Sequence, residues 1–287
     1  MKHPIKPTIF LLCLFFVAQI IGLLITNAYL TDTGWMPLPN VLGFGVERPD
    51  LSPSQTVWTV LIAILAGTFI FLAILKWKFF GLIKVWFFLA LMFCLHIAFG
   101  AFIPSIPAFF LAIFLTSLKL FKNNFFVHNF TELFIYGGLA SIFIPLLTVL
   151  TGFILLILIS IYDMYAVWQS KHMIHLAEAQ AKQGIFAGLA LPYKLSKLHK
   201  KSRTTKQKLQ TKIPVAILGG GDIGFPLMFT GALFVKYGWS SLIIIPFSTL
   251  ALALLFFGAK KNKFYPAMPF ISFGCFVGFL FQWFFLL

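Results

Sequence analysis

The feature that most constrains this chain is a series of long apolar runs, separated by short polar or basic segments. A hydrocarbon core about 30 Å thick is crossed by a helix of roughly 20 apolar residues. A soluble core could not bury so many runs, because 60% of the residues are hydrophobic and only 10% are charged. We therefore predict an all-α, polytopic membrane protein that lies in a lipid bilayer.

The apolar runs predict nine transmembrane helices, near residues 8–30, 57–75, 85–103, 105–121, 128–145, 147–169, 213–235, 241–258 and 264–287. The fifth and sixth are hard to separate, since residues 133–166 are almost uninterrupted. One helix of that length would measure about 50 Å, which is too long for a single crossing. Pro145 and Gly152 are the expected places for a break or bend.

The basic residues predict the orientation. Of the 22 Lys and Arg residues, 20 fall in segments that nine crossings put on one side, namely 1–7, 76–84, 118–126, 170–212 and 259–263. Positively charged loops tend to stay in the cytosol, so the N-terminus is expected there and the C-terminus outside. Topology thus accounts for the net charge of +15. No nucleic-acid partner is expected, because the basic patches contain no recognised binding motif.

One integral membrane domain is expected, in three parts: six spans in 1–169, a basic cytosolic loop in 170–212, and three spans in 213–287. Residues 31–56 are rich in Pro, Gly and acidic residues and are expected to form an external loop. Within the cytosolic loop, residues 171–183 could extend the sixth helix. Mobility is expected beyond about residue 190.

The acidic residues give the main indication of function. There are seven, and the predicted spans contain Asp163 in the sixth and Asp222 in the seventh, while Glu132 lies at the edge of the fifth. An ionisable group at bilayer depth costs about 2.5–3.5 kcal/mol on insertion scales, so it is expected to have a functional role. The two aspartates are expected about 10 and 15 Å from the cytosolic end of antiparallel helices, at similar heights.

Two carboxylates that share a partly dry site cannot both ionise cheaply, so one stays protonated near neutral pH. This is the arrangement of aspartic proteases. The ionised partner takes a proton from a water that attacks a peptide carbonyl, and the protonated partner donates to the developing oxyanion. Gly219, Gly220 and Gly221 are expected to let another backbone approach closely and to loosen the helix around Asp222.

Three motifs in this order resemble those of the presenilin and signal-peptide-peptidase family. They are "YD" at Tyr162–Asp163, "GGGD" at Gly219–Asp222 and "PAMP" at Pro266–Pro269. That family consists of nine-span GxGD intramembrane aspartyl proteases, and the resemblance extends over essentially the whole chain. The compact chain, without a long cytosolic insertion, is most similar to prokaryotic members, in particular archaeal presenilin homologues in the cell membrane.

The resemblance implies roles for single residues. Asp163 and Asp222 would be the catalytic pair, with Tyr162 supporting the first. Gly219 and Gly221 would be the two motif glycines, with Gly220 between them.

The resemblance also covers the start of the ninth span. Pro266, Ala267 and Met268 would form the family's Pro-Ala-Leu element, which shapes the site and holds an extended substrate. Met268 replaces the usual Leu at similar volume, so only a modest change in fit is expected. Pro269 resembles the presenilin branch.

The implied substrates are single-span or signal-anchor segments that enter from the bilayer and are cut in their cytosolic half. A helical substrate hides its carbonyls in hydrogen bonds and must unwind before it is cut. A strand-like partner could satisfy the freed groups. We expect this partner in the start of the seventh span, the end of the cytosolic loop and the stretch "FYPAMPF".

Other interpretations remain open. The aspartates could carry protons or cations in a transporter or channel, with the glycine run as a broken helix. They could also form a structural hydrogen bond between helices. A prepilin-peptidase-like GxGD protease is a nearer alternative.

Two further patterns have simple explanations. "DTG" at Asp32–Gly34 occurs once, in an external loop, and is expected to be a turn. His172, His175 and Glu178 have no further ligand nearby, so they are expected to be solvated. No metal or other cofactor is expected.

Overall fold

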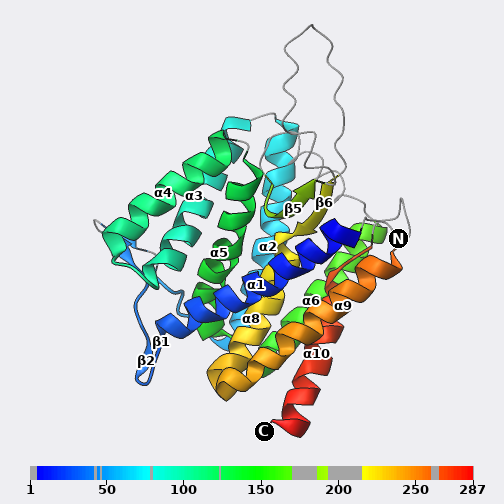
Figure 1. The fold of residues 1–287 in the computed structure, drawn as a ribbon. Coiled ribbons are helices and arrows are strands. Elements are labelled where there is room, and N and C mark those ends of the chain that lie inside the picture. The colour runs from blue at the N-terminus through cyan, green and yellow to red at the C-terminus, as the bar shows by residue number, and fades with distance from the viewer. Residues whose placement is uncertain are drawn as a thin grey trace, which may run out of the picture.

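The computed structural model describes residues 5–41, 44–45, 47–77, 80–122, 124–169, 186–192, 215–259 and 265–286. These residues are mostly helical (Figure 1). The helices are α1 (Ile5–Tyr29), α2 (Pro53–Lys76), α3 (Phe80–Gly100), α4 (Ser105–Phe121), α5 (Phe125–Phe143), α6 (Val149–Trp168), α8 (Gly220–Tyr237), α9 (Ile244–Gly258) and α10 (Met268–Phe285). The predictions for 171–183, for most of the basic loop and for His172, His175 and Glu178 fall outside the described residues.

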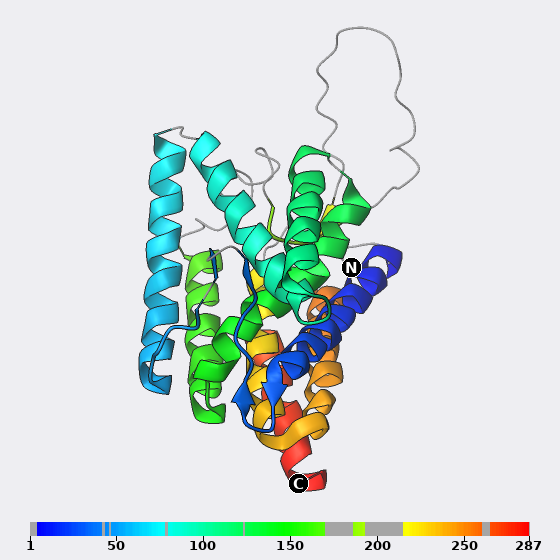
Figure 2. The ribbon, with the colours of Figure 1, turned by 90° about the vertical axis from the view of Figure 1, so that its left-hand side faces the viewer.

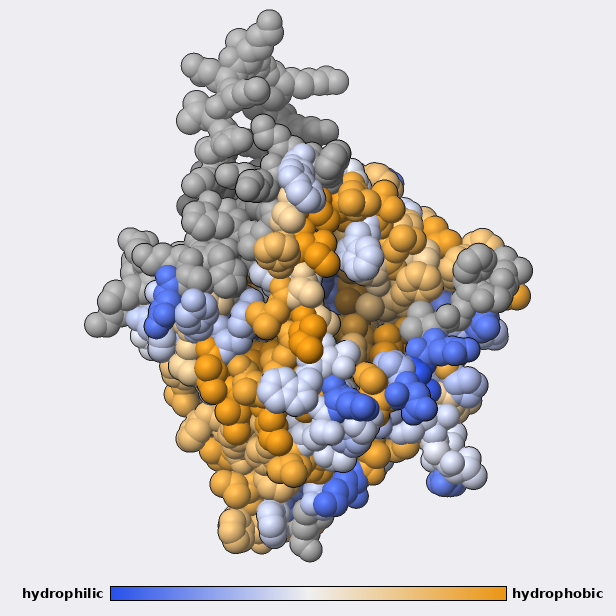
Figure 3. All heavy atoms as spheres, turned by 180° about the vertical axis from the view of Figure 1, so that it is seen from behind, coloured by the Kyte–Doolittle hydropathy of each residue, from blue (hydrophilic) through white to orange (hydrophobic). Residues whose placement is uncertain are grey.

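The helices have the length and composition of membrane spans. Within the described residues, 7 segments are long and apolar enough to cross a bilayer, and one of them, Gly220–Gly258, joins α8 and α9 through a 3-10 turn. α4 is apolar but shorter. Large apolar side chains cover much of the outer surface, including Trp86 at 75% and Phe284 at 77% exposure (Figure 3). Such a surface is suited to contact with lipid.

The break between the fifth and sixth predicted spans lies at Pro145, as expected. A 3-10 turn, Ile144–Leu146, contains this proline and ends α5. α6 then begins with a capping box, in which the Thr148 hydroxyl accepts from the Thr151 backbone and the Thr151 hydroxyl accepts in return. Gly152 lies inside α6 and does not break it. A Cβ there would be 3.2 Å from the Phe229 ring.

The predicted start of the seventh span is wrong. Residues 215–219 form a strand, β6 (Val215–Gly219), and the helix begins only at Gly220. β6 pairs antiparallel with β5 (Gly188–Pro192), so that Gly188 lies opposite Gly219. Asp222 therefore lies in the first turn of α8 and not well inside a helix. Residues 190–192, at the approximate start of the segment in which mobility is expected, belong to β5.

Two more short hairpins lie between α1 and α2, and the first of them lies at the opposite end of the bundle from β5 and β6 (Figures 1 and 2). They are β1 (Leu30–Thr31) with β2 (Gly34–Trp35), and β3 (Asn40–Val41) with β4 (Phe44–Gly45). Asp32 and Thr33 form the turn between β1 and β2, which confirms the expectation for the "DTG" sequence.

The main core brings α6, α8 and α10 together. The ring of Phe153 on α6 lies 4.9 Å from that of Phe229 on α8 and 5.0 Å from that of Phe279 on α10, measured between centroids. α1 joins the same core, since the Gln19 amide donates to the Ile223 carbonyl on α8 over 2.9 Å. A Cβ on Gly22 of α1 would be only 2.2 Å from Leu227, so the two helices approach closely there. These contacts fix the relative positions of the helices that carry the three motifs.

Candidate active site

Asp163 lies near the end of α6 and is buried, with 6% of its surface exposed. One oxygen of its carboxylate accepts the backbone N–H of Met268 over 3.1 Å. The N–H of Ala267 also interacts with it. Met268 is the first residue of α10, and Ala267 is its N-cap. The first N–H groups of a helix have no partner within the helix and carry partial positive charge, so they favour a carboxylate.

Asp222 lies in the first turn of α8 and is half-buried. The backbone N–H of Gly219, the last residue of β6, interacts with its carboxylate. α6 packs against α8, and the carboxylates of Asp163 and Asp222 interact electrostatically. The fold thus brings together the two aspartates and the start of α10, which are far apart in the sequence.

The three glycines before Asp222 differ in their surroundings. A Cβ on Gly220 would lie 2.7 Å from the Tyr136 hydroxyl oxygen, whereas one on Gly221 would meet its nearest neighbour, the Phe225 ring, at 3.4 Å. A Cβ on Gly219 would lie 3.3 Å from a carboxylate oxygen of Asp222. The expected close approach therefore occurs at Gly220. It involves a tyrosine side chain, and not a second backbone as predicted.

The remaining motif residues are Tyr162, Pro266 and Pro269. Tyr162 precedes Asp163 on α6 and is half-buried. Pro266 is buried, and Pro269 lies in the first turn of α10, where a missing N–H is tolerated.

A hydrogen bond between two serine hydroxyls joins α6 and α10 near Asp163. The oxygens of Ser160 on α6 and Ser272 on α10 lie 2.9 Å apart. The start of α10 is thereby held against the end of α6.

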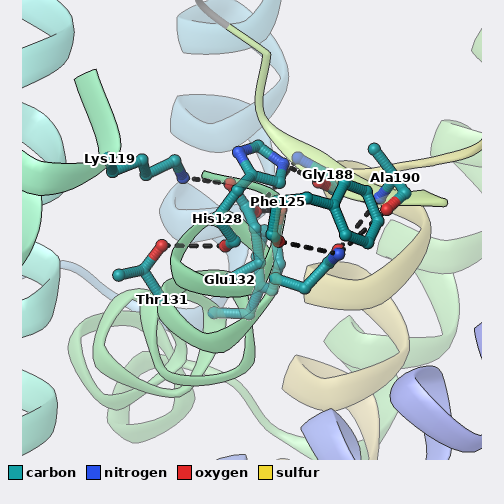
Figure 4. Close-up of polar contacts among 9 residues, drawn as sticks. Lys119, Phe125, His128, Thr131, Glu132, Gly188 and Ala190 are labelled. Carbon is teal, nitrogen blue, oxygen red and sulfur yellow. Dashed lines mark hydrogen bonds and ion pairs between the residues drawn. The ribbon is translucent and has the colours of Figure 1, made fainter. Parts of the chain in front are cut away.

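Two buried charges beside this site were not predicted from the sequence. Lys119 and Glu132 form an ion pair between α4 and α5, with 2% and 0% of their side chains exposed (Figure 4). Lys119 was expected in a basic loop and Glu132 at the edge of a span. Glu132 instead lies inside α5 and is buried, so the described spans contain a third acidic residue besides Asp163 and Asp222. A signal in the sequence could have revealed this ion pair. Lys119 and Glu132 carry opposite charges in two apolar helices that are joined by a short loop.

Comparisons with known proteins agree with this geometry. Among solved structures, "Structure of a presenilin family intramembrane aspartate protease in C222 space group" matches with a TM-score of 0.64 and 20% identity, over 96% of this chain and 98% of that chain. The same title in the P2 space group matches with a TM-score of 0.61 and 20% identity, over 95% of each chain. These likenesses concern the fold. The comparison with curated proteins gave no match.

A family model described as signal-peptide peptidase, presenilin aspartyl protease matches residues 12–286. This match covers nearly the whole chain and includes all three motifs. The chain therefore belongs to the signal-peptide peptidase and presenilin aspartyl protease family.

Proposed function

We propose that this protein is an intramembrane protease that hydrolyses peptide bonds within transmembrane segments, with Asp163 and Asp222 as its catalytic pair. The main support is the interaction of these two carboxylates across packed helices, next to the start of α10. The family to which the chain belongs consists of aspartyl proteases.

The two aspartates have different surroundings, which suggests different roles. Two N–H groups at the start of α10 favour the ionised form of Asp163, whereas a single N–H, that of Gly219, does so for Asp222. We therefore assign Asp163 as the base that takes a proton from the attacking water. Asp222 gives its proton to the carbonyl oxygen, so a neutral tetrahedral diol forms. Asp163 then protonates the amide nitrogen, the C–N bond breaks, and a hydroxyl proton of the diol returns to Asp222.

One edge of the β5–β6 sheet is already occupied by α5. The Asn129 side chain donates to the Ala190 carbonyl over 2.9 Å and accepts the Ala190 N–H over 3.1 Å. Glu132 accepts the Gly188 N–H over 3.0 Å, and the His128 ring contacts the Gly188 carbonyl over 2.8 Å. No backbone group of these two β5 residues is left for an incoming strand.

The other edge of the sheet belongs to β6. Along an antiparallel strand, the backbone N–H and C=O groups of successive residues point alternately toward the partner strand and away from it. Since Ala190 bonds to α5, its opposite residue Ile217 points its N–H and C=O away from β5. The bond from the Gly220 N–H to the Ala187 carbonyl, at 3.3 Å, fits this alternation.

We infer that an unwound substrate pairs with this outer edge of β6 as a third strand. Backbone pairing would satisfy the groups freed by unwinding, and β6 leads directly to Asp222. The substrate class remains single-span or signal-anchor segments that enter from the bilayer.

The proposed topology has nine crossings. α4 is counted as a crossing, and Gly220–Gly258 is divided at its 3-10 turn, because 39 residues would give a helix of about 58 Å. The N-terminus then lies in the cytosol and the C-terminus outside. β5, β6 and the start of α8 lie at the cytosolic end.

Cleavage of a single-span substrate by the reconstituted protein tests the proposed function. Wild type is expected to release two peptide products, and Asp163→Asn and Asp222→Asn are each expected to lower the rate at least ~100-fold, since each removes one proton-transfer group. Glu47→Gln, a matched change at an exposed carboxylate, is expected to have no effect. Wild-type rates in both aspartate variants would refute the proposal. Carboxylate-dependent ion flux without cleavage would support a transporter instead.

A further inference from the structure

Glu132 joins three elements of the fold with one buried carboxylate (Figure 4). One of its oxygens pairs with the Lys119 ammonium at the end of α4. The other accepts the Tyr136 hydroxyl, from one turn further along α5, and the Gly188 N–H of β5 over 3.0 Å. The carboxylate therefore has a cationic partner and two neutral donors.

The ion pair alone gives no reason to keep these charges. Buried ion pairs can often be replaced by apolar residues without loss of stability, because desolvation offsets the attraction between the charges. The contacts of the second oxygen are more informative. They hold a strand and a tyrosine that both lie against the segment carrying Asp222.

The contact through β5 leads directly to the start of α8. Gly188 lies opposite Gly219 in the sheet, and the neighbouring Ala187 carbonyl accepts the N–H of Gly220. Gly188 has φ of +143°, and a Cβ there would be 2.2 Å from the Leu218 carbonyl oxygen. β5 is therefore held closely between Glu132 and β6.

The contact through Tyr136 reaches the same place from the side. The Tyr136 hydroxyl fills the position where a side chain on Gly220 would begin. Its ring also lies 3.8 Å from a Cβ placed on Gly224, one turn further along α8. Asp222 is near enough to interact electrostatically with Tyr136. While Glu132 accepts the hydroxyl proton of Tyr136, that proton is not available to Asp222.

We propose that Glu132 is a positioning residue for the proteolytic reaction. Its carboxylate, balanced by Lys119, fixes β5 and the Tyr136 hydroxyl, and through both it fixes the turn from β6 into α8 that carries Asp222. This inference rests on the proposed function. Glu132 itself does not touch the reacting atoms.

The informative variant is Lys119→Met/Glu132→Leu. Removing both charges avoids leaving one buried and unpaired, which would cost about 3–5 kcal/mol. The Tyr136 hydroxyl and the Gly188 N–H both donate to the same oxygen of Glu132. A glutamine oxygen could still accept both, whereas leucine offers no acceptor, so both donors lose their partner.

The test measures kcat and KM for a single-span substrate, together with amide hydrogen exchange without substrate. We expect the double variant to fold and its kcat to fall about 10–100-fold, because small displacements of a catalytic group have effects of this size. KM should change much less. Exchange at Gly188 and Gly220 should become faster, whereas exchange in α9 should not change. Glu47→Gln is the control, with wild-type values throughout.

Tyr136→Phe is the second variant, and it keeps the ring over Gly220 while removing the hydroxyl. It is expected to lower kcat with normal folding, so the inference stays testable if the double variant does not fold. Wild-type kcat in the variants that fold, with unchanged exchange at Gly188 and Gly220, would overturn the positioning role. Failure of the proposed function would look different, since the wild type itself would then cleave nothing.

Discussion

Asp163 and Met268 lie 105 positions apart in the chain, yet the backbone N–H of Met268 donates a hydrogen bond to the Asp163 carboxylate. Because the donor is a main-chain N–H, the bond does not depend on the side chain at position 268. The bond would therefore also form with a leucine at this position, the residue that the resemblance implies for the family. The side chain of Met268 is buried, with 3% exposure, so its volume matters for packing. A change from methionine to leucine conserves that volume.

Alanine substitutions distinguish the glycines before Asp222. A Cβ at Gly220 would lie 2.7 Å from the Tyr136 hydroxyl, so Gly220→Ala is expected to lower the free energy of unfolding by about 1–3 kcal/mol through overpacking. Gly221→Ala meets no such contact and should raise this free energy by up to about 1 kcal/mol, because alanine favours helix. Denaturant unfolding in detergent measures both. Equal effects, or the reverse order, would contradict the described packing of Tyr136.

At this scale the sequence predicts some residues and not others. Asp163 and Asp222 stand out because carboxylates are rare in apolar runs. Glu132 does not stand out, since its burial depends on Lys119 of another helix and on a strand more than 50 residues away. The role of Tyr136 against Gly220 likewise arises only when α5 packs on α8.

At the scale of elements, the sequence prediction included a strand-like segment at the start of the seventh span, but it also placed helix over these residues and did not identify β5 as the partner of β6. The run Val215–Leu218 is apolar and short, and such runs do not distinguish a strand from the start of a helix. Its strand partner, residues 188–192, lies in a segment otherwise rich in lysine. Side chains of α5 complete the far edge of β5, so tertiary contacts decide the secondary structure here.

A proline at Ile217 tests the proposed substrate edge. The N–H of this residue points away from β5, so Ile217→Pro should preserve the β5–β6 pairing and remove one donor from the outer edge. We expect KM for a single-span substrate to rise at least ~5-fold, as one backbone hydrogen bond is worth about 1 kcal/mol. Ile217→Ala keeps the N–H and serves as the control for the lost side chain. If KM is unchanged in Ile217→Pro and the protein is folded, the substrate does not pair at this edge.

For the whole molecule, apolar run lengths placed most of the described helices to within a few residues, because a bilayer sets a minimum length for each crossing. How the helices pack was less predictable. α2 is the least buried of the candidate spans, with 17% of its window buried, whereas α8 lies among α1, α5, α6 and α10. Contacts such as that between Gly22 and Leu227 depend on pairs of helices and leave no periodic pattern in either.

Cysteine labelling in intact cells tests the proposed orientation. In a background without the native cysteines, Thr33→Cys in the β1–β2 turn should react with a membrane-impermeant maleimide. Lys122→Cys, which is exposed at the end of α4, should react only after the membrane is permeabilised. These expectations follow from the distribution of lysine and arginine. If only Lys122→Cys were labelled in intact cells, the orientation of the protein would be the reverse of the one proposed. Equal labelling of both positions would rule out the three proposed crossings by α2, α3 and α4.

Binding of a peptide isostere with a hydroxyl in place of the scissile bond tests most directly whether Asp163 and Asp222 act together on a tetrahedral intermediate. Such a compound resembles the transition state and should bind far more tightly than substrate if both carboxylates face its hydroxyl. Wild type and Glu47→Gln are predicted to bind it equally, and Asp222→Asn is predicted to bind it at least ~100-fold more weakly. Equal affinity of wild type and a folded Asp222→Asn variant would contradict the central claim.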